Sequence, residues 1–283
     1  MRIGMYEGKP VLITVHNDQL WGTNLETYKD LDEILANWVD FQETFLVNLT
    51  DADVLNNDNA RLLAPEKLEQ PIKNSRQLPA IGFNYRDHLK EMDTSLPKQP
   101  NVFNKFVSSL AGPNNQITIN SDTVDWESEL VVVIGSGGRN IPRENVEDAI
   151  AGFMVGQDLS DRELQKINGA NTQFTLAKSG ENYSPVGPYI TTIGSISDLE
   201  SQRITTKVND RVMQDAPIGQ MIFDFQTLVS YISSTIELYP GDLIFTGTPS
   251  GTGVGRDPQI FLHPGDVVES SIETLGSITT KVN

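Results

Sequence analysis

Acidic side chains recur at every second position of a short segment that leads into an apolar run. Asp125, Glu127 and Glu129 lie in the sequence DWESEL, and the run VVVI follows. Because successive side chains of a strand point to opposite faces, the three carboxylates would share one face, which continues inward through Val131 and Val133. Like charges in a dry site need compensation. A divalent cation would supply it, and carboxylate oxygens favour Mg²⁺, Mn²⁺ or Ca²⁺ over zinc. The alternative is the solvent-exposed face of an amphipathic strand.

A further acidic position follows a second strand-like run, in the sequence AGFMVGQDLSDRELQ. Asp158 comes at the predicted strand exit, where it is a candidate third metal ligand, a turn former or a helix-dipole partner. Ser160 and Glu163 have the spacing of a capping box that begins a helix. Arg162 and Gln165 would share one side of that helix. They are candidates for binding a carboxylate or keto oxygen, or for a solvated helical face.

One histidine has a glutamate at helical spacing, in the sequence GFNYRDHLKEM. His88 and Glu91 would lie on the same helical face. A glutamate that orients an imidazole and raises its basicity lets the imidazole take a proton from water. The alternative is an ordinary surface pair. The other two histidines, His16 and His263, lie in turn-like contexts and are interpreted as structural.

The overall charge is strongly negative. The chain has 38 Asp and Glu against 21 Lys and Arg, a formal net charge of −17. Such a surface repels phosphate backbones, so nucleic acid is not expected as a partner. An anionic small molecule would meet the same repulsion, and its binding requires a local cluster of cations.

Composition also bears on the cellular setting. The chain has no cysteine, no apolar run near the roughly 18 residues that span a bilayer, and no apolar signal segment at its N-terminus. We expect a cytoplasmic protein with no membrane partner.

The elements that must position these side chains divide into two parts. Residues 1–72 predict a small α/β domain, with hairpins in the first 25 residues and a helix whose apolar positions run from Leu31 to Val39. Residues 73–283 predict a β-dominated main domain in which Gly and Pro separate short strands. The clearest late helix lies in FDFQTLVSYISSTIEL.

Seven segments, taken in order, resemble the fumarylacetoacetate hydrolase family and span about residues 80–279. They are GFNYRDHLKEM, VFNKFVSSLAGP, DWESELVVVIG, VGQDLSDRELQ, AKSGENYSPVGPYI, GDLIFTGTPSGTGVG and LHPGDVVESSIETLGSI. The resemblance implies an α+β, β-dominated fold, a mixed β-sandwich roll with a small N-terminal α/β domain. It also implies a homodimer.

The resemblance assigns the metal and catalytic positions. It implies that the metal, Mg²⁺ with Mn²⁺ or Ca²⁺ as alternatives, is bound by Glu127, Glu129 and Asp158. His88 and Glu91 match the dyad that activates water. The lysine of AKSG, Lys178, matches an active-site lysine near the metal and the developing enolate.

The resemblance also assigns substrate contacts. Arg162 and Gln165 match positions that contact substrate oxygens, and Thr248 matches a threonine that binds the substrate carboxylate. Lys105 matches a basic position at the pocket rim. Asp161 departs from the small residue of many members and would add negative charge beside Arg162.

The function implied is a Mg²⁺-dependent hydrolase that cleaves a carbon–carbon bond in a 2,4-dioxo acid of the acylpyruvate type through a metal-stabilised enolate. Oxaloacetate decarboxylation, or isomerisation or decarboxylation of a hydroxymuconate-type acid, is the alternative on the same site. A non-catalytic β protein with a structural Ca²⁺ site is the remote alternative. The polar segment DTSLPKQPN, after the histidine, is suited to a mobile lid.

Overall fold

Strands dominate the computed structural model, which describes residues 1–169 and 172–283. The spatial order of the large sheet is β4 (Arg61–Leu62), β3 (Gln19–Asn24), β2 (Lys9–His16), β1 (Arg2–Tyr6), β14 (Ser184–Thr191), β12 (Ile150–Gln157), β11 (Ser128–Ile134), β17 (Leu243–Phe245), β6 (Leu78–Gly82) and β7 (Asn101–Lys105). Two short strands pair at its side, β5 (Leu68–Glu69) with β1 and β8 (Leu110–Ala111) with β14.

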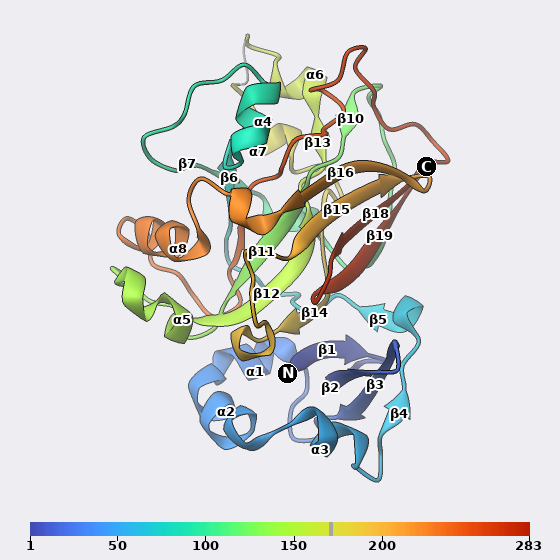
Figure 1. Cartoon of the computed structure of the whole chain (residues 1–283), viewed down its shortest axis with the longest axis vertical. Helices are drawn as coiled ribbons and strands as arrows, with labels where there is room; N and C mark the ends of the chain where they lie inside the picture. Colours follow the sequence, from blue (N-terminus) through green and yellow to red (C-terminus); the bar gives the residue numbers. More distant parts are fainter. Residues whose placement is uncertain (170–171) are drawn as a thin grey trace.

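A second sheet packs on the first (Figure 1). Its order is β16 (Arg211–Pro217), β15 (Arg203–Val208), β18 (Val267–Ile272), β19 (Gly276–Val282) and β9 (Asn114–Ile117). A separate two-stranded pair consists of β10 (Val124–Asp125) and β13 (Ser160–Asp161). Parallel and antiparallel pairs both occur, so the predicted α+β, β-dominated mixed fold is confirmed.

Helices are short and lie around the sheets. The α-helices are α1 (Leu31–Ala36), α2 (Trp38–Thr44), α3 (Asp51–Leu55), α4 (Arg86–Glu91), α5 (Val146–Ala149), α6 (Arg162–Gln165), α7 (Phe174–Ala177) and α8 (Phe225–Ser233). The 3₁₀ turns are η1 (Leu46–Asn48), η2 (Pro65–Lys67), η3 (Val107–Ser109), η4 (Arg143–Asn145), η5 (Ile193–Ser195) and η6 (Ile218–Gln220). Among the described residues, no helix is long and apolar enough to cross a membrane.

The N-terminal strands form the predicted hairpins. Glu7 and Gly8, between β1 and β2, have φ of 50° and 76°, and Asn17 and Asp18, between β2 and β3, have φ of 51° and 58°. Two consecutive positive φ values are typical of type I′ turns, whose twist matches that of the flanking strands. Strand β1 also pairs with β14, so this region extends the main sheet. The boundary between residues 72 and 73 stays a prediction.

The helical pattern that begins at Leu31 forms two helices. Asn37 separates α1 from α2 with φ −119° and ψ 32°. Leu31 and Trp38 are buried as the pattern requires, but Val39 is 53% exposed. Its place on the apolar face was therefore wrong, because the break turns α2 relative to α1. The predicted late helix is confirmed as α8.

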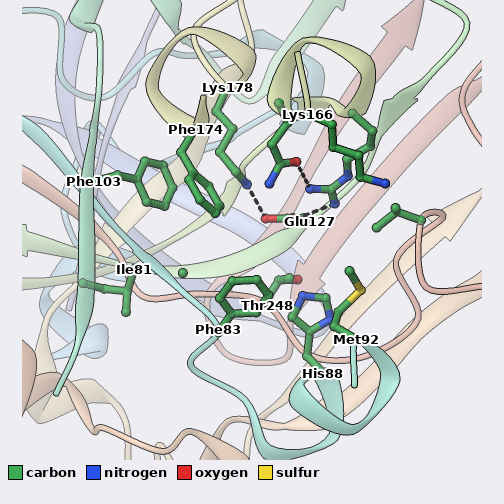
Figure 2. Close-up of a pocket in the computed structure, with 14 residues that line it drawn as sticks. Ile81, Phe83, His88, Met92, Phe103, Glu127, Lys166, Phe174, Lys178 and Thr248 are labelled. Carbon is green, nitrogen blue, oxygen red and sulfur yellow. Dashed lines mark hydrogen bonds and ion pairs between the residues drawn. The ribbon is translucent and has the colours of Figure 1, made fainter. Parts of the chain in front are cut away.

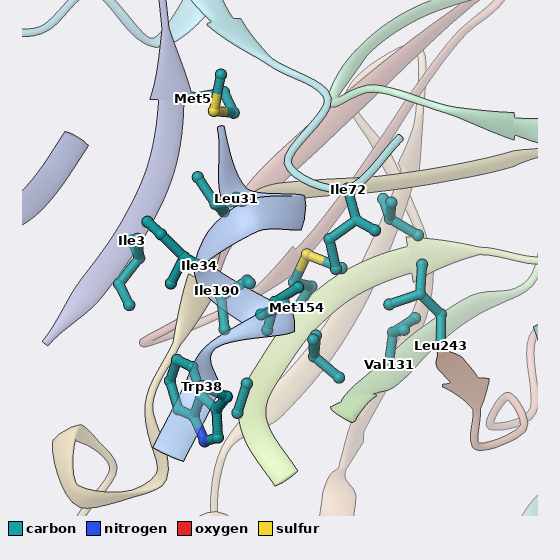
Figure 3. Packing of buried hydrophobic residues seen from close by; sticks show 14 of the residues in the cluster. Ile3, Met5, Leu31, Ile34, Trp38, Ile72, Val131, Met154, Ile190 and Leu243 are labelled. Atoms are coloured by element: carbon teal, nitrogen blue, oxygen red, sulfur yellow. The ribbon is translucent and has the colours of Figure 1, made fainter. Parts of the chain in front are cut away.

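Strand β11 lies between two hydrophobic cores and is buried along its whole length. Val131 and Val133 pack into the core that reaches α1 and β17 (Figure 3), and Val132 packs into the core beneath the second sheet. Burial on both faces explains the unbroken apolar run. The face that carries Glu129 at the strand's start is therefore the face of the first core, as the alternation predicts.

Candidate active site

Three carboxylates meet where β11 begins and β12 ends. The strands pair antiparallel with Glu129 opposite Gly156, and the Asp158 N–H donates to the Glu127 carbonyl at 2.8 Å. This register brings the side chains of Glu127, Glu129 and Asp158 together, with ligand oxygens within 4.8 Å of one another. All three residues are buried. The predicted carboxylate cluster is confirmed as a structural feature.

The donor set of this triad suits a hard divalent cation. Three buried carboxylate oxygens are the ligands that Mg²⁺, Mn²⁺ or Ca²⁺ prefers. Burial and repulsion by Asp158 and Glu127 raise the pKa of Glu129 well above its usual value. Burial alone would also raise the pKa of Glu127, but Lys178 and Arg162 outweigh it and lower that pKa to about 2. The site therefore concentrates more negative charge than its neighbouring cations balance.

Lys178 lies at the C-terminal end of α7 and bridges two members of the triad. Its Nζ donates to Glu127 Oε2 and to Asp158 Oδ2, both at 2.7 Å. Burial would lower the pKa of Lys178, but attraction to Asp158 and Glu127 raises it. The side chain is therefore a fixed ammonium beside the triad, at the position that the family resemblance implied.

Lys105 is not at the pocket rim, so that expectation was wrong. It is fully buried at the end of β7, where Nζ donates to Asp158 Oδ1 at 2.5 Å and to the Tyr183 carbonyl at 3.2 Å. It is absent from the described residues that line the cavity. Strand β7 is the edge strand of the large sheet and pairs with β6. From this strand the Lys105 side chain reaches Asp158. Lys105 therefore neutralises Asp158 from the protein side, and its proposed contact with substrate stays a prediction.

Asp161, and not Ser160, begins α6. Its carboxylate accepts from the Leu164 N–H at 3.1 Å and from the Ser121 and Thr123 hydroxyls. The predicted capping box of Ser160 and Glu163 was wrong, because Ser160 is in β13, its hydroxyl donates to the Asp158 carbonyl, and the residue three positions after Asp161 is Leu164. The Asp161 carboxylate is hydrogen-bonded to the Leu164 N–H and the two hydroxyls, and Asp161 is not among the described residues that line the cavity.

Arg162 and Gln165 lie on the same side of α6, as predicted. Arg162 donates to Gln165 Oε1 at 2.9 Å, to Glu127 Oε1 at 2.5 Å and to Asp125 Oδ2 at 2.9 Å. Burial would lower the pKa of Arg162, but Glu127 and Asp125 hold it above its usual range. Arg162 thus ties one metal-ligand candidate to the helix. Its contact with substrate stays a prediction.

Asp125 does not join the triad. Strand β10 ends at Asp125 and β11 begins at Ser128, yet the carboxylates of Asp125 and Glu127 both contact Arg162 Nη2, at 2.8 and 2.5 Å. The buried Asp125 carboxylate accepts from Arg162 and from the N–H groups of Gly253 at 2.6 Å and Val254 at 3.0 Å. It fixes the loop after β17 against the arginine.

The His88–Glu91 pair is formed on α4. His88 Nδ1 and Glu91 Oε2 are 2.9 Å apart, and Glu91 also accepts from the Gly251 N–H at 2.8 Å. Burial would raise the pKa of Glu91, but these hydrogen bonds lower it. An ionised Glu91 holds the imidazole by Nδ1 and leaves Nε2 toward the cavity, which His88 lines together with Glu127. The pairing predicted from spacing is present, and its catalytic role stays a prediction.

Thr248 lines the same cavity but already has partners. Its hydroxyl donates to the Ser128 carbonyl and accepts from Gln214 Nε2, each at 2.8 Å. Because a hydroxyl has one proton, Thr248 can donate to a substrate carboxylate only by releasing Ser128. That contact stays a prediction.

Two glutamines that the sequence analysis missed hold the backbone of the metal-ligand segment. Gln157 Oε1 accepts from the Glu127 N–H at 2.8 Å, and Gln214 Oε1 accepts from the Ser128 N–H at 3.1 Å. A glutamine directly before Asp158, ending an apolar strand, was a usable signal. Gln214 lies in β16 and no local pattern marked it.

Figure 2 shows the cavity enclosed by these side chains, with Lys178, Glu127 and Lys166 on one side and His88 and Met92 on the other. Its volume is about 30 Å³, which is room for one or two water molecules. Substrate entry therefore requires side chains at the mouth to move. Met92 directly precedes the predicted lid, residues 93–101, whose motion stays a prediction.

Comparison with known proteins places the chain in a family. Residues 78–283 match the family model Fumarylacetoacetate (FAA) hydrolase C-terminal. The chain is 41% identical over 232 residues to oxaloacetate tautomerase fahd2, mitochondrial, of Xenopus laevis. The aligned region covers 81% of this chain and 70% of that protein. The fumarylacetoacetate hydrolase of psychrophilic Exiguobacterium antarcticum superposes with a TM-score of 0.84 at 29% identity, covering 100% of this chain and 99% of that one. The 5-carboxymethyl-2-hydroxymuconate delta-isomerase of Mycobacterium smegmatis gives 0.75 at 27% identity, covering 100% and 98%. The chain therefore belongs to the fumarylacetoacetate hydrolase family.

Proposed function

We propose that this protein is a divalent-metal-dependent hydrolase that cleaves a carbon–carbon bond in a 2,4-dioxo acid of the acylpyruvate type. The observation that carries the proposal is the His88–Glu91 pair, hydrogen-bonded at 2.9 Å, which opens on the cavity that Glu127 also lines. A base beside a carboxylate triad is the arrangement that hydrolysis through an enolate requires.

The carboxylate triad would hold the metal, with Mg²⁺ proposed and Mn²⁺ or Ca²⁺ as alternatives. When bound, the ion supplies positive charge that stabilises the enolate oxygen. Lys178 adds a fixed positive charge at the same end of the cavity. Together with Arg162 and a bound divalent ion, it would offset the carboxylates of the site, which an anionic substrate requires in a chain of net charge −17.

His88 would take a proton from water, and Glu91 would stabilise the imidazolium that forms. The hydroxide oxygen bonds to the distal carbonyl carbon, and the bond between that carbon and C3 breaks. Its electron pair passes into the enolate of pyruvate, and protonation at C3 completes the reaction. The products are a carboxylic acid and pyruvate.

The test is cleavage of acetylpyruvate by protein freed of metal with EDTA and then supplied with Mg²⁺. We expect acetate and pyruvate in equal amounts, seen by NMR, and no turnover without metal. His88→Gln should slow turnover about 10²–10⁴-fold, while His263→Gln, at an exposed histidine, should retain it. Full activity in excess EDTA would contradict the proposal.

Tautomerisation of oxaloacetate is the second candidate, and it is favoured by the 41% identity to the Xenopus oxaloacetate tautomerase. His88 could serve that reaction by moving a proton between C3 and the C2 oxygen, with no water consumed. Loss of the enol absorbance without release of pyruvate would favour this candidate. Release of pyruvate and CO₂ from oxaloacetate would indicate decarboxylation instead.

We further propose that the protein acts as a cytoplasmic homodimer on a small 2-oxo acid. The family resemblance supports the dimer, and the absence of cysteine is compatible with a reducing compartment. The Xenopus relative is named as mitochondrial, so fractionation of the source cells is the test of location. Light scattering coupled to gel filtration tests the dimer.

A further inference from the structure

We propose that three phenylalanines of the cavity, Phe83, Phe103 and Phe174, form the binding site for the distal group of the substrate and select an apolar group. We call these residues the aromatic wall. The inference rests on the proposed function, since it assumes that a 2-oxo acid binds with its charged end at the triad. It makes the substrate a dioxo acid with an uncharged acyl tail and not a dicarboxylic acid.

The aromatic wall is assembled from three separate parts of the chain. Phe83 follows β6, Phe103 lies in β7 and Phe174 begins α7, and all three line the cavity. The rings of Phe103 and Phe174 stack with centroids 5.2 Å apart, and Phe83 meets Phe174 edge to face at 6.4 Å. In Figure 2 the rings of Phe103 and Phe174 lie together on the side of the cavity away from Lys166, and the Phe83 ring lies on the side of His88.

The backbone of Phe83 has a strained conformation. Its φ of 59° lies in the left-handed region, where a bulky side chain is rare. Backbone strain of this kind persists where the surrounding structure enforces it, and it is concentrated at ligand sites. The strained backbone directs the Phe83 ring toward the cavity and places it 6.0 Å from the His88 ring, nearly parallel to it at 19°. The wall therefore begins directly beside the proposed base, where a distal acyl group would lie.

The charges around the cavity are unfavourable for a second carboxylate at the wall. Three cationic side chains occur among the described lining residues, Arg162, Lys166 and Lys178. Arg162 and Lys178 are buried and already paired with carboxylates. Lys178 Nζ lies 5.5 Å from the Phe103 ring and marks where the charged end meets the wall. Lys166 is exposed and lies on the opposite side in Figure 2.

The three rings are partly buried. A carboxylate placed against them would lose part of its water without gaining a free cation, which is unfavourable. An alkyl or aromatic tail would instead bury apolar surface against three rings. The wall therefore discriminates by the charge of the distal group.

Binding of three 2-oxo acids tests the proposal, measured by calorimetry on the full chain with saturating Mg²⁺. Pyruvate has no distal group, phenylpyruvate has a planar apolar one, and 2-oxoglutarate has a carboxylate. None has the 4-oxo group that hydrolysis requires, so binding is read without turnover. We expect phenylpyruvate to bind at least about tenfold more tightly than 2-oxoglutarate, the range that an apolar pocket provides.

Binding to variants tests whether the aromatic wall causes the preference for phenylpyruvate. Phe174→Ala should weaken phenylpyruvate binding about tenfold or more and leave pyruvate binding within about twofold. Leu176→Ala, at a residue of the same helix that is 51% exposed and does not line the cavity, should change neither. Phe103→Leu, which keeps an apolar side chain, should retain most of the preference.

Two results would overturn the inference. One is 2-oxoglutarate binding as tightly as phenylpyruvate to the unaltered protein. The other is Phe174→Ala weakening pyruvate and phenylpyruvate equally, which would make the ring structural. Failure of pyruvate itself to bind would instead contradict the proposed function.

Discussion

Asp125→Asn should destabilise the protein strongly although it replaces one oxygen by a nitrogen. Oδ1 of the buried Asp125 accepts from the N–H groups of Trp126 at 2.8 Å and Gly253 at 2.6 Å. Oδ2 accepts from the Val254 N–H at 3.0 Å and from Arg162 Nε at 2.9 Å. An asparagine has one oxygen, so whichever way its amide turns, two of these donors face an NH₂ group.

The expected loss follows from these unpaired donors. Each buried donor without an acceptor costs about 1–3 kcal/mol, and breaking one side of a buried ion pair costs about 3–5 kcal/mol. These costs overlap, so we expect a loss of about 3–5 kcal/mol, a large share of the roughly 5–15 kcal/mol that stabilises a typical domain.

Urea unfolding followed by tryptophan fluorescence measures this loss, with EDTA present so that metal binding adds no stability. Asp122→Asn, a change of the same charge at an exposed residue three positions earlier, should stay within about 0.5 kcal/mol of the unaltered protein. A loss below about 1 kcal/mol for Asp125→Asn would refute the role given to this carboxylate.

Three further predictions concern the metal, the base and a helix cap. Mg²⁺ at about 100 times its Kd should add about 2.7 kcal/mol, or roughly 4–5 °C in Tm for a chain of this length. Glu129→Gln should lose this shift in scanning fluorimetry, and an unchanged shift would contradict the metal role. His88→Gln should slow acetylpyruvate cleavage about 10²–10⁴-fold while keeping the Mg²⁺-dependent Tm shift, and loss of both would make His88 structural. Hydrogen bonding to Arg143 lowers the pKa of Asp224, the cap of α8, to about 2. Because this folded-state pKa lies below the unfolded value of about 3.9, its contribution is present above pH about 4 and is lost as the pH falls toward 2. Asp224→Asn should remove that part of the pH dependence of the unfolding free energy, about 1 kcal/mol for a partly exposed pair; an unchanged profile would contradict it.

Local sequence patterns were sufficient for features that neighbouring residues create together. The His88–Glu91 pair follows from helical spacing, and the place of Glu129 on the inward face follows from the two-residue period of a strand. The turn at Asn17 and Asp18 follows from residue types that tolerate positive φ. Resemblance of seven ordered segments then joined these separate patterns into one family fold.

Tertiary structure alone decided which distant groups meet, because strand register and loop placement set those contacts and no local period encodes them. Within its own segment Asp125 has the spacing of a metal ligand. Its oxygens instead accept hydrogen bonds from the N–H groups of Gly253 and Val254, more than a hundred residues later. The lysine expected at the rim became the buried partner of Asp158 because β7 pairs with β6 at the edge of the sheet. The aromatic wall had no signal in the sequence for the same reason, since its rings come from three segments that only the folded chain brings together.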